Sequence, residues 1–220
     1  MIERRLMQTE DGSATLYVPA MDEHYHSVKG ARAEAEHIYI EMGMMHVLQD
    51  RCDDRLLRVL EVGLGTGLNA LLTLERCERD GVFVHYDAVE LYPLRWDEIA
   101  PLEYSDAEEF RALHDSVWEE DVALTLHFTL RKLQTDVRDV SIAPVDVIYY
   151  DAFAPEKQPE MWTLDLMERM YGLLNPRGVL TTYCAKGVVR RMLQQVGFKV
   201  ERLPGPVGGK REILRAIKEK

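Results

Sequence analysis

Cysteine is scarce in this sequence, and its few residues lie far apart. Cys52, Cys77 and Cys184 are odd in number and show no C-x-x-C spacing. Such a pattern is typical of reduced thiols in a cytoplasmic protein and argues against a disulfide framework or a zinc site. We therefore expect no bound metal and no disulfide bonds.

Long apolar runs and excess positive charge are also missing. No run could span a bilayer, and the first residues, MIERRLMQTEDG, contain no apolar segment of a signal peptide. We expect a soluble cytoplasmic protein with no membrane partner. The 38 acidic residues outnumber the 27 Lys and Arg, which gives a net charge of −11. A nucleic-acid partner would therefore require a local basic face.

What the chain does contain is a regular alternation of apolar strand-like and helix-like segments. This alternation, in 220 residues of which 46% are hydrophobic, predicts one α/β domain with a mostly parallel sheet covered on both faces. The strand-like runs are 57–62, 82–90, 121–129, 145–150, 178–184, 197–203 and 211–217, and the helix-like segments are 67–79, 93–115, 162–173 and 187–196. The linker 204–209 is too short for a crossover helix, so the last two strands should form an antiparallel hairpin.

The first fifty residues predict an extension of this domain. Residues 3–9 and 14–19 flank Asp11-Gly12, a strong hairpin signal, and a helical stretch follows from Ala31 to Gln49. We expect a single domain, 1–220, made of an amino-terminal extension (1–50) and a ligand-binding core (51–220).

The strongest motif lies between the first core strand and its helix. Glu61, Gly63, Gly65 and Gly67 form an E-x-G-x-G-x-G pattern, which is typical of methyltransferases that use S-adenosyl-L-methionine (SAM). Glycine lets the backbone turn sharply against a ligand, and free N–H groups at the helix start suit the carboxylate of SAM. We predict cofactor contacts at these four residues, at Leu68 and Asn69 and, at later strand ends, at Glu90 and Asp151. A plain strand–turn–helix joint is the alternative.

Two further strand ends have acidic residues, and ligands of open α/β sheets bind at such ends. Glu90 could accept hydrogen bonds from the ribose hydroxyls of the cofactor. Asp151 could orient a substrate amine, accept its proton and, with the ring of Phe153, stabilise the developing positive charge. The simpler alternatives are a solvated acid at position 90 and a turn-forming aspartate at position 151.

Positive charge is concentrated at the carboxyl end. Residues 190–220 contain nine Lys and Arg but only three acids, which indicates a phosphate-contacting face or, equally, ordinary solvated faces. The pair His24 and His26 has no evident third metal ligand, so a plain loop is the better interpretation.

Several stretches together resemble the methyltransferase domain of the MnmC family. They are 61–69, Asp-Ala-Phe-Ala-Pro at 151–155, Pro-Glu-Met-Trp-Thr at 159–163, Val-Arg-Arg at 189–191 and Gly-Lys-Arg-Glu at 209–212. The resemblance runs from about Tyr25 to Leu214. It implies a Rossmann-like class I fold and methyl transfer from SAM to 5-aminomethyluridine at the tRNA wobble position.

The resemblance has further implications and two departures. The partner would be the anticodon region of tRNA. From the basic carboxyl end of the chain, we expect its phosphates to contact Arg190, Lys210 and Arg211. The family's FAD-dependent oxidase domain has no counterpart, so the chain resembles the stand-alone form. The family tends to have Gly-Asp after the third strand, where the acid contacts adenine. Counting along 122–130 puts Thr129 and Leu130 there, and Asp136 or a backbone amide is the substitute.

Two other functions fit part of the same pattern. An aminopropyltransferase also combines a glycine turn, a strand-end acid and an amine-activating aspartate, but uses decarboxylated SAM. A catalytically silent fold that binds tRNA is the other alternative, and the presence of both Glu90 and Asp151 argues against it.

Overall fold

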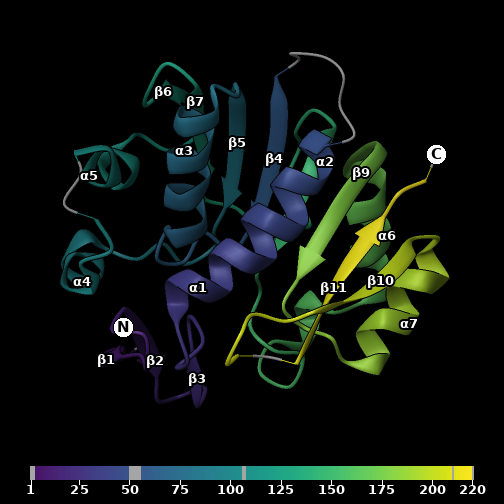
Figure 1. Cartoon of the computed structure of the whole chain (residues 1–220), viewed down its shortest axis with the longest axis horizontal. Helices are drawn as coiled ribbons and strands as arrows, with labels where there is room; N and C mark the ends of the chain where they lie inside the picture. The colour runs from purple at the N-terminus through teal and green to yellow at the C-terminus, as the bar shows by residue number, and fades with distance from the viewer. Residues whose placement is uncertain (1–2, 50–55, 106–107, 210, 220) are drawn as a thin grey trace.

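Eight strands form the central sheet of the computed structural model, which describes residues 3–49, 56–105, 108–209 and 211–219 (Figure 1). Their order across the sheet is β10-β11-β9-β8-β4-β5-β7-β6. In chain order they are β4 (Leu57–Val62), β5 (Val84–Val89), β6 (Asp121–Ala123), β7 (Phe128–Leu133), β8 (Val145–Tyr150), β9 (Leu174–Thr182), β10 (Lys199–Pro204) and β11 (Glu212–Ile217).

The pairing confirms a mostly parallel sheet that ends in an antiparallel hairpin. β9, β8, β4, β5 and β7 run parallel, whereas β11 is antiparallel to both β9 and β10. The carboxyl ends of the parallel strands therefore meet at one edge, the lower edge in Figure 1. Ligands of open α/β folds bind at this edge.

Alternating side chains along the strands divide the core between the two faces of the sheet. Val59, Tyr86 and Tyr149 pack in one cluster beneath α3 (Leu68–Asp80) and a long helical run. Leu60 and Ile148 pack in another cluster beneath α6 (Leu164–Leu173) and α7 (Gly187–Val196). The result is a three-layer α/β/α arrangement, as expected from two-residue periodicity in doubly covered strands.

The long helical run is the one predicted from Ala31 to Gln49, but its middle is not α-helical. It consists of α1 (Ala31–Ala35), η1 (Glu36–Met44), which is a π-helix, and α2 (Met45–Gln49). It crosses the front of the sheet in Figure 1 and packs on β9, β8 and β11. π-Helical segments are rare and are found frequently at functional sites.

Two predicted elements are wrong in detail. The run 121–129 contains the short edge strand β6 and the start of β7, which is antiparallel to it, so the third parallel strand is β7 and ends at Leu133. The segment 93–115 is not one helix. It contains α4 (Trp96–Ile99), the 3₁₀ turn η2 (Ala100–Leu102) and α5 (Glu108–Asp115). Pro101 lies at the start of η2, where a proline is tolerated but an α-helix is not continued.

A separate three-stranded sheet precedes the helical run. The predicted hairpin is confirmed by β1 (Arg5–Gln8) paired with β2 (Ala14–Val18), and β2 also pairs with β3 (Glu23–His24). At the turn, Gly12 takes a positive φ of 85°, and the Asp11 carboxylate accepts a hydrogen bond from the Ser13 backbone. This sheet lies at the same lower end of the molecule as the carboxyl ends of the parallel strands (Figure 1).

Candidate active site

The glycine turn connects β4 to α3 through three left-handed residues. Gly65 and Gly67 have φ values of 50° and 76°, which side-chain-bearing residues rarely adopt. Space is also limiting, because a Cβ on Gly65 would lie 3.1 Å from the Tyr25 ring and one on Gly67 would lie 2.8 Å from the His114 ring. No side chain caps the start of α3. Bare backbone is thus available to a ligand at this turn.

A first cavity of about 270 Å³ opens beside this turn. Its wall combines the ends of β4, β5, β7 and β8 with residues of the amino-terminal extension. Its lining includes Arg4, Tyr25, His26, Gly63, Gly65, Glu90, Asp136, Asp151 and Phe153. The cavity is therefore built mostly at the carboxyl edge of the sheet, where a ligand is expected.

Glu90 joins the end of β5 to the glycine turn. One carboxylate oxygen accepts a hydrogen bond from the Gly65 backbone N–H at 3.0 Å, and the other accepts one from the Tyr92 N–H at 2.8 Å. Carboxylate oxygens have two lone pairs each, so the group can accept further hydrogen bonds from a ligand in the first cavity. The geometry allows the predicted contact with a ribose.

The corrected third strand changes the adenine candidate. Because β7 ends at Leu133, Thr129 and Leu130 lie inside the strand, and the residues that follow its end are 134–136. Thr135 and Asp136 line the first cavity. Hydrogen bonding to Arg138 lowers the pKa of Asp136, which stays ionised. Of the substitutes considered, Asp136 is placed where an adenine could reach it.

Asp151 follows β8 and lies at the centre of the site. Its backbone N–H donates to the Val62 carbonyl, which holds it beside the end of β4. One carboxylate oxygen accepts a hydrogen bond from the Tyr39 hydroxyl at 2.5 Å, and the other accepts one from the Asn69 side-chain amide at 2.9 Å. Asp151 also lines a second cavity.

The second cavity, of about 250 Å³, shares a wall with the first. Tyr25, His26, Asp151, Ala152 and Phe153 line both cavities. The rings of Tyr25 and Phe153 meet edge to face, with centroids 5.2 Å apart. The remaining wall of the second cavity includes Glu23, His24, Glu34, Tyr39 and Tyr183. A carboxylate and an aromatic pair thus separate two adjacent chambers.

Four predicted cofactor contacts are not brought to the wall of the first cavity. Glu61, Gly67, Leu68 and Asn69 are absent from its lining, because the chain turns into the buried start of α3 after Thr66. Glu61 is fully buried on β4, and its carboxyl accepts a hydrogen bond from the Asn69 amide at 2.9 Å. Glu61 is therefore connected to the cavity through Asn69 and Asp151.

Sequence reasoning missed the residues that the extension contributes. Arg4 donates to the Tyr25 hydroxyl at 3.1 Å and pairs with Glu98 at 2.8 Å, which joins the extension to α4. His26, considered above only as a loop residue, contacts the Thr66 hydroxyl at 2.7 Å. The only available signal was the unusual density of Tyr and His at 24–26. Among the described residues, no three His, Cys, Asp or Glu side chains are placed to hold a metal ion.

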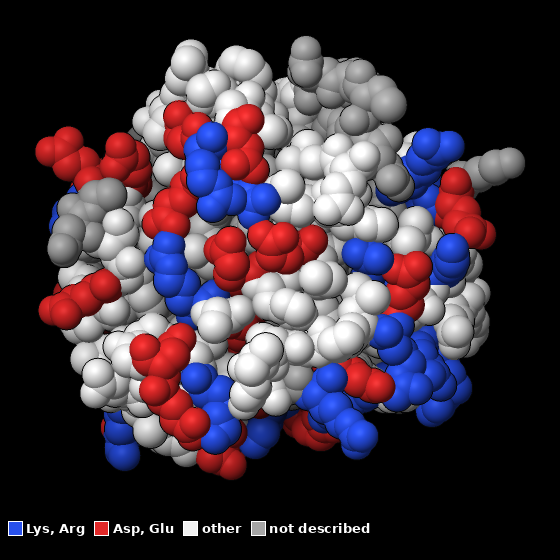
Figure 2. All heavy atoms as spheres, viewed as in Figure 1, with Lys and Arg blue, Asp and Glu red and all other residues white. Residues whose placement is uncertain are grey.

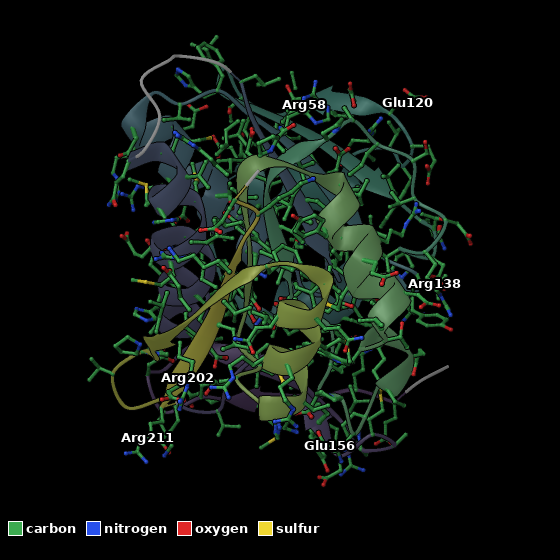
Figure 3. All side chains as sticks on the ribbon, turned by 90° about the vertical axis from the view of Figure 1, so that its right-hand side faces the viewer. Arg58, Glu120, Arg138, Glu156, Arg202 and Arg211 are labelled. Atoms are coloured by element: carbon green, nitrogen blue, oxygen red, sulfur yellow. The ribbon has the colours of Figure 1, made fainter. Side chains whose placement is uncertain are left out.

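Fewer basic side chains at the carboxyl end are available to a ligand than the composition suggests, because some form ion pairs within the protein. Arg202 pairs with Glu212, and Arg215 pairs with Glu201 at 2.7 Å. Arg211 is exposed and makes no ion pair with any described residue, whereas Lys210 lies outside the described residues. Figure 2 shows Lys and Arg gathered in the region of α7 and the β10–β11 hairpin. Arg202 and Arg211 lie at the same end of the molecule as Glu156, in the loop after β8 (Figure 3).

Arg190, the third predicted phosphate contact, is only half exposed on α7. Its Nε atom is buried and has no hydrogen-bond partner among the described residues. Its neighbour Arg191 is exposed. On α7, therefore, Arg191 is exposed to solvent and Arg190 is partly enclosed by the protein.

Comparison with known proteins decides the class. Residues 102–219, more than half of the chain, match a family described as S-adenosyl-L-methionine-dependent methyltransferase. The chain belongs to this family. SAM is therefore its cofactor, and the aminopropyltransferase alternative is not supported. Among the described residues, no helix is long and apolar enough to cross a membrane.

Relatives confirm the resemblance to the MnmC family. A Pseudomonas fluorescens tRNA 5-methylaminomethyl-2-thiouridine biosynthesis bifunctional protein MnmC is 32% identical over 213 residues, covering 88% of this chain and 32% of that protein. The Burkholderia multivorans protein of that name is 30% identical, covering 97% of this chain and 35% of its own length. The methyltransferase chain thus spans about a third of the length of these relatives.

A solved structure confirms the fold. MnmC2 from Aquifex aeolicus superposes with a TM-score of 0.79 at 24% identity, covering all of this chain and 71% of that one. A putative class I SAM-dependent methyltransferase from Listeria monocytogenes superposes with a TM-score of 0.51 at 16% identity, covering 80% of this chain and 57% of that one. The predicted Rossmann-like class I methyltransferase fold is therefore correct.

Proposed function

We propose that this methyltransferase converts 5-aminomethyluridine, thiolated or not, to 5-methylaminomethyluridine at the tRNA wobble position. The observation that carries the proposal is the position of Asp151, whose carboxylate lies in the wall between two adjacent cavities. One cavity suits the cofactor and the other an amine-bearing base. The names of the MnmC relatives supply tRNA and the product, 5-methylaminomethyl-2-thiouridine, and the proposed substrate is this nucleoside without its N-methyl group.

The first cavity fits SAM by an observation independent of the family match. Gly63 and Gly65 line it with backbone that no side chain could replace, because a Cβ would lie 3.2 Å from the Asp151 carbonyl or 3.1 Å from the Tyr25 ring. The N–H groups of Gly63 and Gly65 already donate to Val89 and Glu90, so in the proposed arrangement their carbonyls hold the amino group of SAM. Glu90 holds the ribose and Asp136 faces the adenine. When bound, SAM supplies a methyl group activated by its sulfonium sulfur.

The second cavity suits the amine that receives this methyl group. A primary amine must lose its charge before it attacks, and the nitrogen becomes positive again as the N–C bond forms and the C–S bond breaks. Asp151 orients the amine, stabilises the positive nitrogen and accepts the released proton. Phe153 presents an aromatic ring to the same nitrogen and adds a cation–π attraction.

The aromatic lining of the second cavity favours an unpaired base over a small aliphatic amine. Tyr25, Tyr39, Phe153 and Tyr183 all contribute to it. Proteins that read RNA sequence usually take single-stranded bases of loops and stack them on aromatic side chains. The wobble base of an anticodon loop meets this requirement, because it lies in a single-stranded loop.

We place the RNA face on α7 and the β10–β11 hairpin, beside the mouth of the second cavity. Arg211 is exposed just before β11, and the Pro204 carbonyl at the loop end of the hairpin accepts a hydrogen bond from His37 of η1. The hairpin is thus connected to the helical run that contains Tyr39. The tRNA phosphates would contact Arg190, Lys210 and Arg211. The positive charge of these side chains would attract tRNA locally, although the protein as a whole is negative.

We also propose that 1–220 acts as one domain in the cytoplasm, with the extension 1–50 as part of the site. Arg4, Tyr25 and His26 line the first cavity, and η1 packs against the central sheet. An extension that forms cavity walls and contributes to the core is expected to fold together with residues 51–220.

The decisive experiment compares tRNA nucleosides from cells with and without this protein by mass spectrometry. We expect 5-aminomethyluridine to accumulate without it, and the purified protein with SAM to methylate that tRNA. The variant Asp151→Ala serves as the inactive control. An unchanged nucleoside profile, together with no methylation of tRNA that contains the aminomethyl group, would refute the proposed substrate.

A further inference from the structure

Both oxygen atoms of the Asp151 carboxylate are held by buried side chains from different helices. The Tyr39 hydroxyl, from η1, donates to Oδ1 at 2.5 Å, and the Asn69 Nδ2, from α3, donates to Oδ2 at 2.9 Å. Two donors fix the plane of the carboxylate and favour its ionised form. The orientation of Asp151 is therefore set before any amine arrives.

Tyr39 is placed for this bond by the π-helical segment. Its side chain is buried, and its ring packs on Tyr149 with centroids 5.3 Å apart. Burial, together with the charge of Asp151 and the nearby Tyr183 and Glu34, raises the pKa of Tyr39 well above its usual value. The hydroxyl consequently keeps its proton and remains a donor.

Asn69 is fixed in turn by Glu61. Its side-chain amide has two N–H bonds, and its nitrogen lies 2.9 Å from both Asp151 Oδ2 and Glu61 Oε1. The two acceptors use both bonds and fix the rotamer of the amide. Glu61 thus acts on Asp151 through one intervening side chain, although it lines neither cavity.

The surroundings of Glu61 suit an uncharged acid. Glu61 Oε2, Asn69 Oδ1 and the hydroxyl of Tyr86 beside Glu61 are all buried and lack a well-formed hydrogen bond among the described residues. A protonated Glu61 carboxyl would place an O–H donor among these buried atoms. An ionised Glu61 would instead put a second buried negative charge close to Asp151, which is unfavourable. Burial, Asp151 and Glu90 raise the pKa of Glu61 well above its usual value, although Asn69 and Tyr86 oppose the shift.

We propose that Tyr39 and Glu61 are positioning residues for methyl transfer. Tyr39 holds Oδ1 of Asp151 directly, and Glu61, as a neutral carboxylic acid, holds Oδ2 through Asn69. The amine thereby meets an ionised, correctly oriented base. This inference rests on the proposed function for the identity of the amine, but it concerns the state of Asp151 itself.

The test uses four variants of the full chain. Tyr39→Phe removes only the donor to Oδ1, and Glu61→Gln replaces a neutral acid by a neutral amide of the same shape. Glu61→Leu removes the acceptor for Asn69. Tyr149→Phe is the matched control, because it removes a buried hydroxyl 3.4 Å from Thr73 in the same aromatic cluster without a bond to Asp151.

Two readouts are measured for each variant. The first is the pKa of Asp151, followed by carbon NMR of aspartate-labelled protein without tRNA. The second is the pH profile of kcat and KM with aminomethyl-containing tRNA. For Tyr39→Phe we expect a raised Asp151 pKa, an acid limb moved to higher pH and a kcat lower by about 10- to 100-fold, with KM little changed. Glu61→Leu should resemble it, whereas Glu61→Gln and Tyr149→Phe should resemble the parent protein.

Three results would overturn the proposal. They are an unchanged Asp151 pKa in Tyr39→Phe, an effect of Tyr149→Phe equal to that of Tyr39→Phe, or a folded Glu61→Gln protein with its kcat lowered as far as that of Asp151→Ala. If Glu61→Leu does not fold, Glu61→Gln alone decides the charge state, since an amide cannot replace a working carboxylate. If the parent protein fails to methylate tRNA, the proposed substrate is refuted, and the NMR measurement still judges the role of Tyr39.

Discussion

The carboxylate of Glu90 accepts a hydrogen bond from the backbone N–H of Gly65 at 3.0 Å. The acid at the end of β5 therefore holds the glycine turn at the end of the neighbouring strand, β4. This contact couples the two features most typical of a SAM site. A ligand at Glu90 is consequently also a ligand at the glycine turn. Changes at either residue should affect cofactor binding.

Glu90→Ala should weaken SAM binding by roughly 1–3 kcal/mol, because it removes a charged hydrogen-bond acceptor from the wall of the first cavity. Calorimetric titration with SAM measures the loss. Glu120→Ala is the control, since Glu120 is exposed and lines neither cavity. Equal affinities of Glu90→Ala and the parent protein would remove Glu90 from the cofactor site.

Gly67→Ala should destabilise the protein by at least about 1–2 kcal/mol, the cost of a left-handed conformation for a residue with a Cβ. The new Cβ would also lie 2.8 Å from the ring of His114. The midpoint of urea unfolding measures the change. Gly172→Ala in α6 is the matched control, because a Cβ there meets open space and should be neutral or slightly stabilising. Similar midpoints for both variants would contradict the crowding argument.

Asp151→Asn should lower the rate of methyl transfer by ~10²–10⁴-fold, the range for loss of a general base. SAM affinity should stay close to that of the parent protein, because Asp151 contacts the cofactor region only along the shared wall. Single-turnover methylation of tRNA and titration with SAM separate the two effects. A rate within a few-fold of the parent would reduce Asp151 to a turn residue.

His114 should make the protein less stable as the pH falls from about 6.5 to 4. Burial, with help from the charge of Lys132, lowers the pKa of His114 to about 4, so the unfolded chain binds this proton first. The loss should be on the order of 2 kcal/mol by pH 4.5. Urea unfolding of His114→Gln should show a weaker dependence over this range, and a curve parallel to the parent would exclude the effect.

His85 should give the protein the opposite pH dependence of stability. Its contact with Asp87 raises its pKa, so its stabilisation is complete below the unfolded value of about 6.5 and is lost as the pH rises through the folded value. His85→Gln should therefore cost more stability at pH 6 than at pH 8.5. The same unfolding experiment at both pH values checks the sign.

Reversal of charge at Lys210 and Arg211 should raise the KM for tRNA and reduce its dependence on salt, because phosphate contacts release counterions. SAM affinity should not change. Arg58→Glu is the control, since Arg58 lies at the other end of the molecule from Arg211 (Figure 3). An unaltered KM and salt slope would exclude this RNA face and make the extension the next candidate.

The sequence predicts well those parts of the fold that local periodicity determines. β4, β8 and α7 occupy the predicted residues, because doubly covered strands and amphipathic helices have clear patterns. The division of 121–133 into β6 and β7 was missed, because an apolar run does not show where a chain reverses direction. That single error misplaced by several residues the strand end at which an adenine contact is expected.

The site was predictable only where a motif marks it. The glycine turn, Glu90 and Asp151 follow strands and attract attention by position. Tyr39 and Arg4 reach the site from distant segments, and nothing in their local sequence distinguishes them from other tyrosines and arginines. Likewise, the pairing of Arg202 with Glu212 depends on the hairpin register, which composition does not contain.

The shared wall of Tyr25, Asp151 and Phe153 also matters for inhibitor design. A compound that joins an adenosine group to an amine-bearing pyrimidine by a short linker would occupy both cavities at once. Linking makes the second binding event intramolecular, so two weak fragments can yield one tight ligand. Because the extension supplies Tyr25, such a bisubstrate compound would discriminate against methyltransferases with a different amino-terminal segment.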